Sequence, residues 1–359
     1  MPTFQGLGLH RKSRPSRVGD TRVAAARNAL RMRLLCRIAG AAILLAAAPA
    51  CAEQIKIGIL KVASSGPVYL AQDMGFFAAE GLTVEFVNFE AGQAVAVAVV
   101  AGDADFGVTG LTAGLYNLAA RGELRVIAGF HREAPGFRVL GYFASRQAYA
   151  AGLTALKNLP GHSIAITTIG STTHYAVGLL AEKYGFPIKS VRIVPAQTIS
   201  NSVATVLGNQ ADAGLIPGTL SNEMTEHGAK LLGWVGDETP WQIGSVFVAT
   251  KTVDQRADMV RHVLRALGKA AHVYHDAFTG PGETRLDGPT APAALAIIAK
   301  YVGEPTARLE LELPYVDPEL RLNLKDVAHQ ITWYKAQGMV KCDITADLLV
   351  DKRYATPLR

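Results

Sequence analysis

The sequence predicts an α/β protein of two lobes, each a mainly parallel sheet flanked by helices, with a hinged cleft between the lobes. Three observations lead to this prediction. The chain has 359 residues, which is more than a single hydrophobic core usually serves. Residues 55–110 and 163–218 follow the same order of patterns. In both segments, strand-like runs alternate with helical ones, which is typical of parallel sheets.

The repeated unit sets the order of the elements. Each copy has a strand, a small-residue loop, a helix, a glycine turn, a second strand, a second helix, and an Ala-Asp-x-Gly turn before a short strand. Asp105 and Asp212 lie 107 residues apart, as do Val84 and Val191, which begin the second strands. Each copy should therefore form a parallel βαβαβ unit.

One segment of the first copy is ambiguous. Residues 94–100, "AVAVAVV", alternate like a strand and are rich in valine. We expect a helix there, because the matching residues 202–207 have helical spacing and Gly102 follows as a stop signal.

The remaining segments complete the two lobes. Strand-like runs at 138–145 and 245–250 flank the second copy, and we expect them to be the hinges. The helical segments after Thr250 should pack on the first lobe. The expected domains are residues 1–52 as an N-terminal extension with a signal peptide, 53–143 with 246–359 as lobe 1, and 144–245 as lobe 2.

The net charge of +6 resides in the N-terminal extension. Residues 1–52 hold nine basic residues and one acid, which leaves 27 basic and 29 acidic residues in the body. We therefore expect no nucleic-acid surface. The basic stretch precedes a short apolar run with small residues at its end, a pattern typical of a secretory signal. Met32 is an alternative start, cleavage is expected after Ala50 or Ala52, and lipid modification of Cys51 is a less favoured alternative.

In open α/β sheets, ligands bind beyond the carboxyl ends of the strands. There both copies carry loops rich in glycine and hydroxyl residues. The facing loops should line a cleft that closes around a ligand. The candidate ligand-binding residues are Ser64, Ser65, Gly66, Gln93, Thr109, Gly110, Thr112, His131, Ser171, Thr172, Thr173, His174, Pro217 and Gly218.

The stretch 170–174, "GSTTH", begins the first helix of the second copy. A helix start offers unpaired N–H groups and a positive dipole end, which favour an anion. We therefore predict that a carboxylate or sulfonate lies between this loop and Ser64-Ser65-Gly66, with His174 neutral. Simple capping by Ser171 is the alternative. At Thr109, Thr112 and Pro217-Gly218, ligand contact and ordinary turn structure remain open.

The segments 66–87, 170–185 and 333–340 resemble the nitrate/sulfonate/taurine class of ABC-importer binding proteins, whose relatives bind pyrimidine precursors. The likeness runs from about Gln54 to Lys352, and the helix start at 170–174 is similar to that of sulfonate binders. It implies a periplasmic binding protein with two chain crossings at the hinge. Such a protein, expected here as a monomer, would deliver a small solute to an inner-membrane permease and its ATPase.

Other readings remain. The residues contain none of the common enzymatic motifs, so we predict no enzyme and no cofactor, with an enzyme or a sensor domain on the same scaffold as the alternative. His272 and His275 have helical spacing but lack a third partner, so we expect no metal. Arg132 or Arg138 could bring positive charge near the cleft. Trp241 is either a wall for a ring-bearing ligand or a buried residue near the second crossing.

Overall fold

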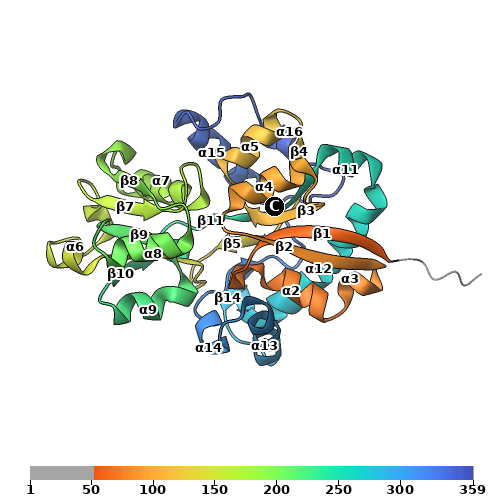
Figure 1. Cartoon of the computed structure of the whole chain (residues 1–359), viewed down its shortest axis with the longest axis horizontal. Coiled ribbons are helices and arrows are strands. Elements are labelled where there is room, and N and C mark those ends of the chain that lie inside the picture. The colour runs from red at the N-terminus through yellow and green to blue at the C-terminus, as the bar shows by residue number, and fades with distance from the viewer. Residues whose placement is uncertain (1–51, 359) are drawn as a thin grey trace, which may run out of the picture. The chain divides into compact units, whose positions relative to one another are not determined.

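The structure is a computed structural model, and it describes residues 52–358. The signal peptide, its cleavage site and Cys51 lie outside the described residues, apart from Ala52. Within the described part, two five-stranded sheets each form the centre of a lobe, and a small three-stranded sheet lies between them (Figure 1). The two-lobed α/β prediction is confirmed.

The first sheet has the order β2-β1-β3-β12-β4, and the second has the order β8-β7-β9-β6-β10. In each, the first three strands are parallel, the fourth runs antiparallel to them, and the fifth is antiparallel to the fourth and so has the direction of the first three. The strands of the first sheet are β1 (Glu53–Leu60), β2 (Leu82–Phe89), β3 (Phe106–Gly110), β4 (Leu124–Gly129) and β12 (Gly244–Ala249). Those of the second are β6 (Leu140–Ala144), β7 (Ser163–Ile166), β8 (Arg192–Pro195), β9 (Ala213–Pro217) and β10 (Lys230–Trp234).

The predicted repeat is confirmed in detail. In both copies the aspartate before the third strand accepts a backbone N–H of the first strand: Lys56 N donates to Asp105 at 2.8 Å, and Ser163 N donates to Asp212 at 2.7 Å. Residues 94–100 are helical, as predicted, and lie within α4 (Gly92–Ala101), which Gly102 terminates with φ of 91°. A residue with a Cβ would be strained in that left-handed conformation.

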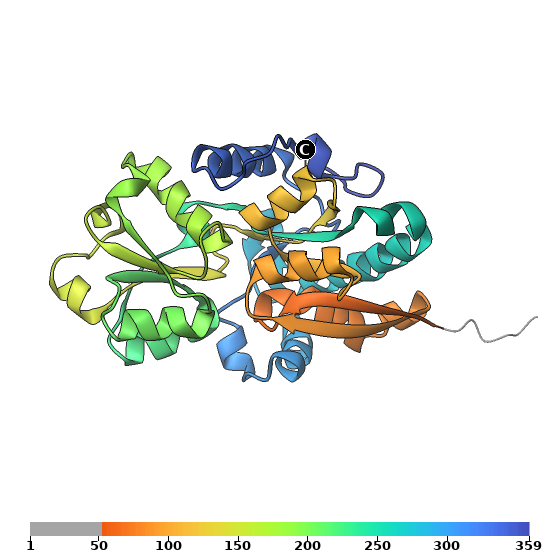
Figure 2. The ribbon, with the colours of Figure 1, turned by 45° about the horizontal axis from the view of Figure 1, so that its top comes forward.

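The helices flank both sheets (Figure 2). Those of the first half are α2 (Gly66–Asp73), α3 (Phe76–Ala79), α4 and α5 (Ala113–Ala120). Those of the second half are α6 (Arg146–Ala150), α7 (Thr172–Tyr184), α8 (Ile199–Leu207), α9 (Ser221–Glu226) and α10 (Val235–Glu238). The C-terminal helices are α11 (Thr250–Gln255), α12 (Ala257–Phe278), α13 (Ala291–Val302), α14 (Thr306–Leu309), α15 (Leu324–Ala336) and α16 (Ala346–Leu349), with a hairpin of β13 (Thr279–Gly280) and β14 (Thr284–Arg285) between α12 and α13.

The two segments expected to be hinges are strands of the two sheets. β6 and β12, which cover most of 138–145 and 245–250, are the fourth strands of the two sheets. The second sheet therefore takes in residues from Leu140, earlier than the expected boundary at 144. Both segments are strands, as predicted, and pairing with β9 and β3 holds them inside the sheets. The chain crosses between the sheets just before them instead.

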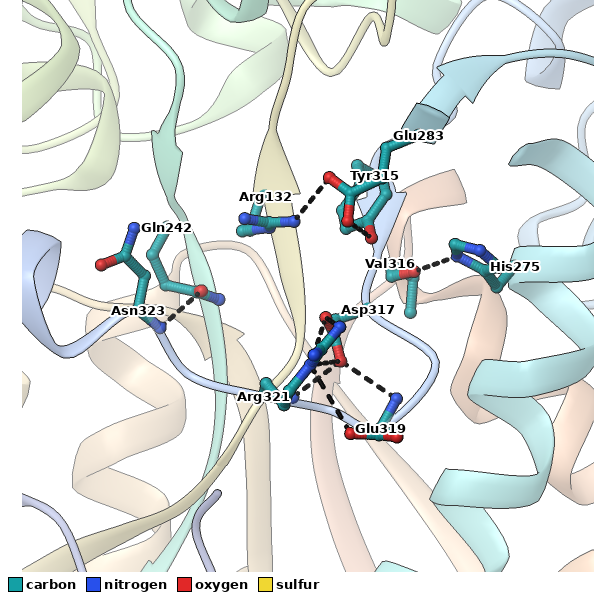
Figure 3. A network of polar contacts seen from close by, with 10 residues as sticks. All are labelled: Arg132, Gln242, His275, Glu283, Tyr315, Val316, Asp317, Glu319, Arg321 and Asn323. Carbon is teal, nitrogen blue, oxygen red and sulfur yellow. Dashed lines mark hydrogen bonds and ion pairs between the residues drawn. The ribbon is translucent and has the colours of Figure 1, made fainter. Parts of the chain in front are cut away.

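Three short strands form the crossing region: β5 (His131–Glu133), β11 (Trp241–Gln242) and β15 (Tyr315–Val316). Arg132 lies in the middle strand, with its guanidinium carbon 4.3 Å from the centre of the Tyr315 ring and Nη2 3.6 Å from Glu283 Oε2 (Figure 3). Asn323 N donates to Gln242 Oε1 at 3.4 Å. This network joins the crossing strands to the C-terminal segment.

The C-terminal helices divide between two roles. The apolar face of α12 is buried against the first sheet and α2, as predicted. Helix α15 departs from the prediction, because it also packs on α7 of the second half: Tyr334 Oη donates to Ser171 O at 2.9 Å. The ring of Trp333 lies so close to Gly178 that a Cβ there would be 2.3 Å from it. In Figure 2 the dark blue helix α15 lies at the top of the molecule, beside the green helices of the second half.

Candidate functional site

A cavity of about 110 Å³ lies between the two sets of strand ends. Loops of both sheets line it, together with β5 and the segment after α14. Its apolar wall includes Leu60, Val108, Leu140, Leu215 and Ile243. The predicted residues that line it are Ser64, Ser65, Gln93, Thr109, Gly110, Thr112, His131, Ser171, Thr172, Thr173 and Pro217. The structure therefore brings these eleven residues around one space.

The other three predicted residues, Gly66, His174 and Gly218, do not line the cavity. At Gly66 a Cβ would lie 2.8 Å from Ile298, so this residue faces the C-terminal helices. At Gly218 a Cβ would lie 1.9 Å from Leu311 O, so the backbone is pressed against the loop after α14. Both glycines are needed for close packing behind the cavity.

His174 lies in the first turn of α7 and points away from the cavity. Its ring meets Trp333 edge-on at 5.5 Å. Burial lowers its pKa to about 4, so it is neutral at pH 7. Gly170 N donates to Nδ1 at 3.2 Å, which places the ring proton on Nε2. The neutral form was predicted, but the ring supports the loop from behind.

The hydroxyls at the start of α7 have separate partners. Ser171 Oγ accepts from His174 N at 3.2 Å and therefore caps the helix. Thr173 Oγ1 lies 2.8 Å from Ser171 Oγ and accepts from Thr167 N at 3.2 Å. Within residues 52–358, the hydrogen bonds that the structure describes include none by the Thr172 side chain. The backbone N–H groups of Thr172 and Thr173 have no partner inside the helix, because they belong to its first turn.

The matching loop of the first half is arranged differently. Ala63–Ser65 form a 3₁₀ turn before α2, and Ser65 makes no capping bond to that helix. Its Oγ instead donates to Leu60 O at 2.8 Å. Ser64 is buried on the cavity wall. Thr112 caps α5 by accepting from Leu115 N at 3.2 Å, so it combines turn structure with a place on the wall.

The two rims of the cavity are in contact. Gln93 Nε2 on α4 donates to Ile169 O at 2.9 Å, and Ala113 N donates to Gly170 O at 2.9 Å. A Cβ on Gly110 would lie 2.4 Å from Thr172 Cγ2. Only glycine at 110 therefore lets the β3 end and the α7 start approach this closely.

The candidate sources of positive charge do not supply it. His131 is buried on the cavity wall, and burial lowers its pKa to about 4, so the ring is neutral. Arg132 is held by Tyr315 and Glu283 outside the cavity. Arg138 stacks on Trp234 at 5.5 Å. Trp241 is buried and meets Tyr175 at 4.9 Å, so the burial reading holds for it.

Two acidic residues that were not among the candidates, Glu90 and Glu312, lie on the cavity wall. Glu312 is 2% exposed and lies after α14, outside both copies of the repeat. Thr219 Oγ1 donates to its Oε2 at 2.8 Å. Burial raises the pKa of Glu312 to about 7, although hydrogen bonds from Thr219 and Ser64 lower it. The only local signal is the alternation "LELELP" at 309–314, which gives no indication of which glutamate is buried.

The described residues contain no group of three or more His, Cys, Asp or Glu that could hold a metal ion. His275 Nδ1 lies 3.0 Å from Val316 O (Figure 3). A membrane-spanning helix would need to be longer and more apolar than any between residues 52 and 358.

Known proteins share this architecture. The chain resembles the alkanesulfonate-binding protein SsuA from Xanthomonas axonopodis pv. citri bound to MOPS, with a TM-score of 0.65, 18% identity, and coverage of 85% of this chain and 99% of that one. For the periplasmic aliphatic sulphonate binding protein SsuA from Escherichia coli, the TM-score is 0.64 and the identity 17%, and the match covers 86% of this chain and 94% of that one. For the periplasmic nitrate-binding protein NrtA from Synechocystis PCC 6803, the TM-score is 0.65 and the identity 13%, and the match covers 83% of this chain and 85% of that one.

These structural likenesses show the fold, which is that of the two-lobed periplasmic binding proteins. No curated protein matches the chain. The family model described as "NMT1/THI5 like" matches residues 63–281, which is more than half of the chain. The chain therefore belongs to the NMT1/THI5-like family.

Proposed function

We propose that this protein is an exported solute receptor of an ABC importer. It binds one small organic solute in the cavity between the two lobes and releases it unchanged to a permease and its ATPase. The observation that carries the proposal is the cavity itself, because both copies of the repeat contribute polar strand-end loops to one concave, largely apolar space. Such a space is the usual form of a small-molecule site.

The start of α7 is the proposed site for a negatively polarised group of the solute. The Thr172 hydroxyl and the backbone N–H groups of Thr172 and Thr173 are available there. A carboxylate, a sulfonate or a carbonyl oxygen could accept these donors. The contacts of Gln93 and Gly110 across the rims would enclose the solute.

We propose that the lobes open by movement at the crossing strands β5 and β11. These strands pair over two residues each, Trp241 with Glu133 and Gln242 with Arg132. A few residues at element ends are enough to absorb a hinge rotation. The proposed lobes follow the two sheets, with the exchange of chain near residues 134–139 and 235–240.

The basic, then apolar, N-terminal sequence supports export to the periplasm. The solute-binding proteins of the same fold support transport over catalysis. An enzyme or a sensor on this scaffold would differ in outcome: an enzyme would change the solute, and a sensor would bind it without depending on a permease.

A thermal-shift screen against small carboxylates, sulfonates, nitrate, amines and pyrimidines tests the proposal. A solute that binds the folded state alone raises the melting temperature. Replacement of Thr172 by tryptophan should fill the cavity and abolish that rise, whereas Thr332→Trp, on the exposed face of α15, should not. Mass spectrometry should recover the solute unchanged. A converted solute, or stabilisation that Thr172→Trp leaves intact, would contradict the receptor.

A further inference from the structure

The charged side chains on the cavity wall are all acidic. Among residues 52–358, Glu90 and Glu312 line the cavity, and no lysine or arginine does. Glu90 is exposed at the rim, whereas Glu312 is 2% exposed. The part of the wall that the structure describes therefore has a buried carboxylate and no cationic side chain.

Glu312 lies where the two lobes meet. Thr219, which follows β9 in the second lobe, donates to its Oε2 at 2.8 Å, and Ser64 in the first lobe is its other hydrogen-bonding neighbour. Neutral donors satisfy part of its hydrogen-bonding capacity. Burial still outweighs them, as the raised pKa of about 7 indicates. A buried carboxylate without a cation is costly to the folded state.

We propose that Glu312 determines the specificity of the cavity by binding a positively charged N–H group of the solute, an ammonium or an amidinium. This inference rests on the proposed function. A bound cation supplies the opposite charge that the wall lacks, and the charge-assisted hydrogen bond is strong in an apolar surrounding. A bare anion such as nitrate would instead enter next to a carboxylate. The start of α7 stays available to an acceptor group of the same solute.

The size of the cavity limits the cationic solute. Its volume of about 110 Å³ is below the ~150 Å³ of a cavity that accepts benzene. A molecule of a few heavy atoms therefore fits without opening the rims. Two pairs of probes of matched shape and opposite charge meet this limit: guanidinium with nitrate, and acetamidinium with acetate.

Isothermal titration calorimetry on the wild-type protein compares the members of each pair, as chloride and sodium salts at millimolar concentration. We expect each cation to bind about tenfold or more tightly than its matching anion. This comparison needs no variant, so it does not depend on the folding of a mutant. The proposal is overturned if neither cation binds more tightly than its anion.

Three variants locate the effect. Glu312→Gln keeps an acceptor for Thr219 but removes the charge, and it should lower cation affinity about tenfold or more. Thr219→Val removes the hydrogen bond and keeps the carboxylate, so it should preserve the preference for cations. Glu90→Gln should change affinity less than Glu312→Gln. If Thr219→Val abolished cation binding as fully as Glu312→Gln, Glu312 would be a latch between the lobes and the inference would be wrong.

The two proposals fail in different ways. Anions that bind in the cavity and are blocked by Thr172→Trp would refute the role of Glu312 and leave the receptor function standing. A protein that binds neither the paired probes nor any member of the screening panel would refute both.

Discussion

The two copies of the repeat place the same elements at the cavity but use their hydroxyl groups differently. At the start of α7, Ser171 caps its own helix through His174 N. At the start of α2, Ser65 turns back to the carbonyl of Leu60 on the preceding strand. Pro67 in the first turn of α2 has no N–H to cap, and the 3₁₀ turn before it redirects the chain. A duplicated topology therefore fixes where polar loops lie, but not which partner each hydroxyl takes.

The largest expected consequence of this difference between the two helix starts is in the stability of the protein at acidic pH. His174 has no counterpart at the start of α2, where the chain carries Pro67. Its folded pKa of about 4 lies below the ordinary 6.5, so the unfolded state binds more protons between these values. The contribution of the neutral His174 ring to the unfolding free energy is complete above pH 6.5 and is lost as the pH falls toward 4. The pKa of His174 differs by about 2.5 between the folded and unfolded states. On acidification we therefore expect the His174→Gln variant to lose less unfolding free energy than the wild type, by up to about 3 kcal/mol.

Urea unfolding at a series of pH values measures this effect. His131, with a similarly lowered pKa, serves as a second site of the same sign in the crossing region. Equal acid sensitivity of His174→Gln and the wild type would show that the ring is not desolvated.

Glu312 should show the opposite dependence on pH. Its folded pKa of about 7 lies above the ordinary 4.5, so its stabilising contribution is complete below pH 4.5 and is lost as the pH rises through 7. Glu312→Gln should therefore make the protein without solute more stable than the wild type at pH 8, by up to about 3 kcal/mol. Unfolding curves at pH 4 and pH 8 test this. The same difference in unfolding free energy between the variant and the wild type at both pH values would contradict this prediction.

The contact between the two rims can be broken and restored. Gly110→Ala places a Cβ 2.4 Å from Thr172 Cγ2, and we expect a loss of about 1–3 kcal/mol in unfolding free energy. Thr172→Ser removes the Cγ2 methyl and should recover most of that loss in the double variant. The matched control is Gly107→Ala, whose Cβ would meet Phe247 at 2.3 Å inside the first sheet. If Thr172→Ser rescued Gly107→Ala equally well, the coupling would not be local to the rims.

The smallest expected effect concerns the two serines themselves. Ser171→Ala removes a helix cap and should cost about 1 kcal/mol of unfolding free energy. Ser65→Ala removes one donor to Leu60 O, which keeps Val62 N at 3.0 Å and Tyr69 Oη at 3.3 Å. We therefore expect a loss of only about 0.5 kcal/mol there. Chemical denaturation of both variants under one set of conditions would compare them, and a larger loss in Ser65→Ala would reverse the assignment.

Much of the site could be predicted, because a parallel βαβ topology brings loops far apart in sequence to one edge of a sheet. Thr109, at the end of β3, and Thr172, in the segment after β7, are examples from the two recognised copies. Glu312 could not be found in this way. It belongs to neither copy, and only the packing of the segment after α14 against Gly218 brings it to the cavity.

The sequence by itself determined the repeat and the order of strands and helices. These features depend on local periodicity and on the few topologies that parallel strands allow. The tertiary structure decided that the strand-like segments near 140 and 246 pair inside the sheets, and that α15 bridges the lobes. It also decided the charge of the cavity, because burial and the distance between charged groups depend on which distant segments pack together.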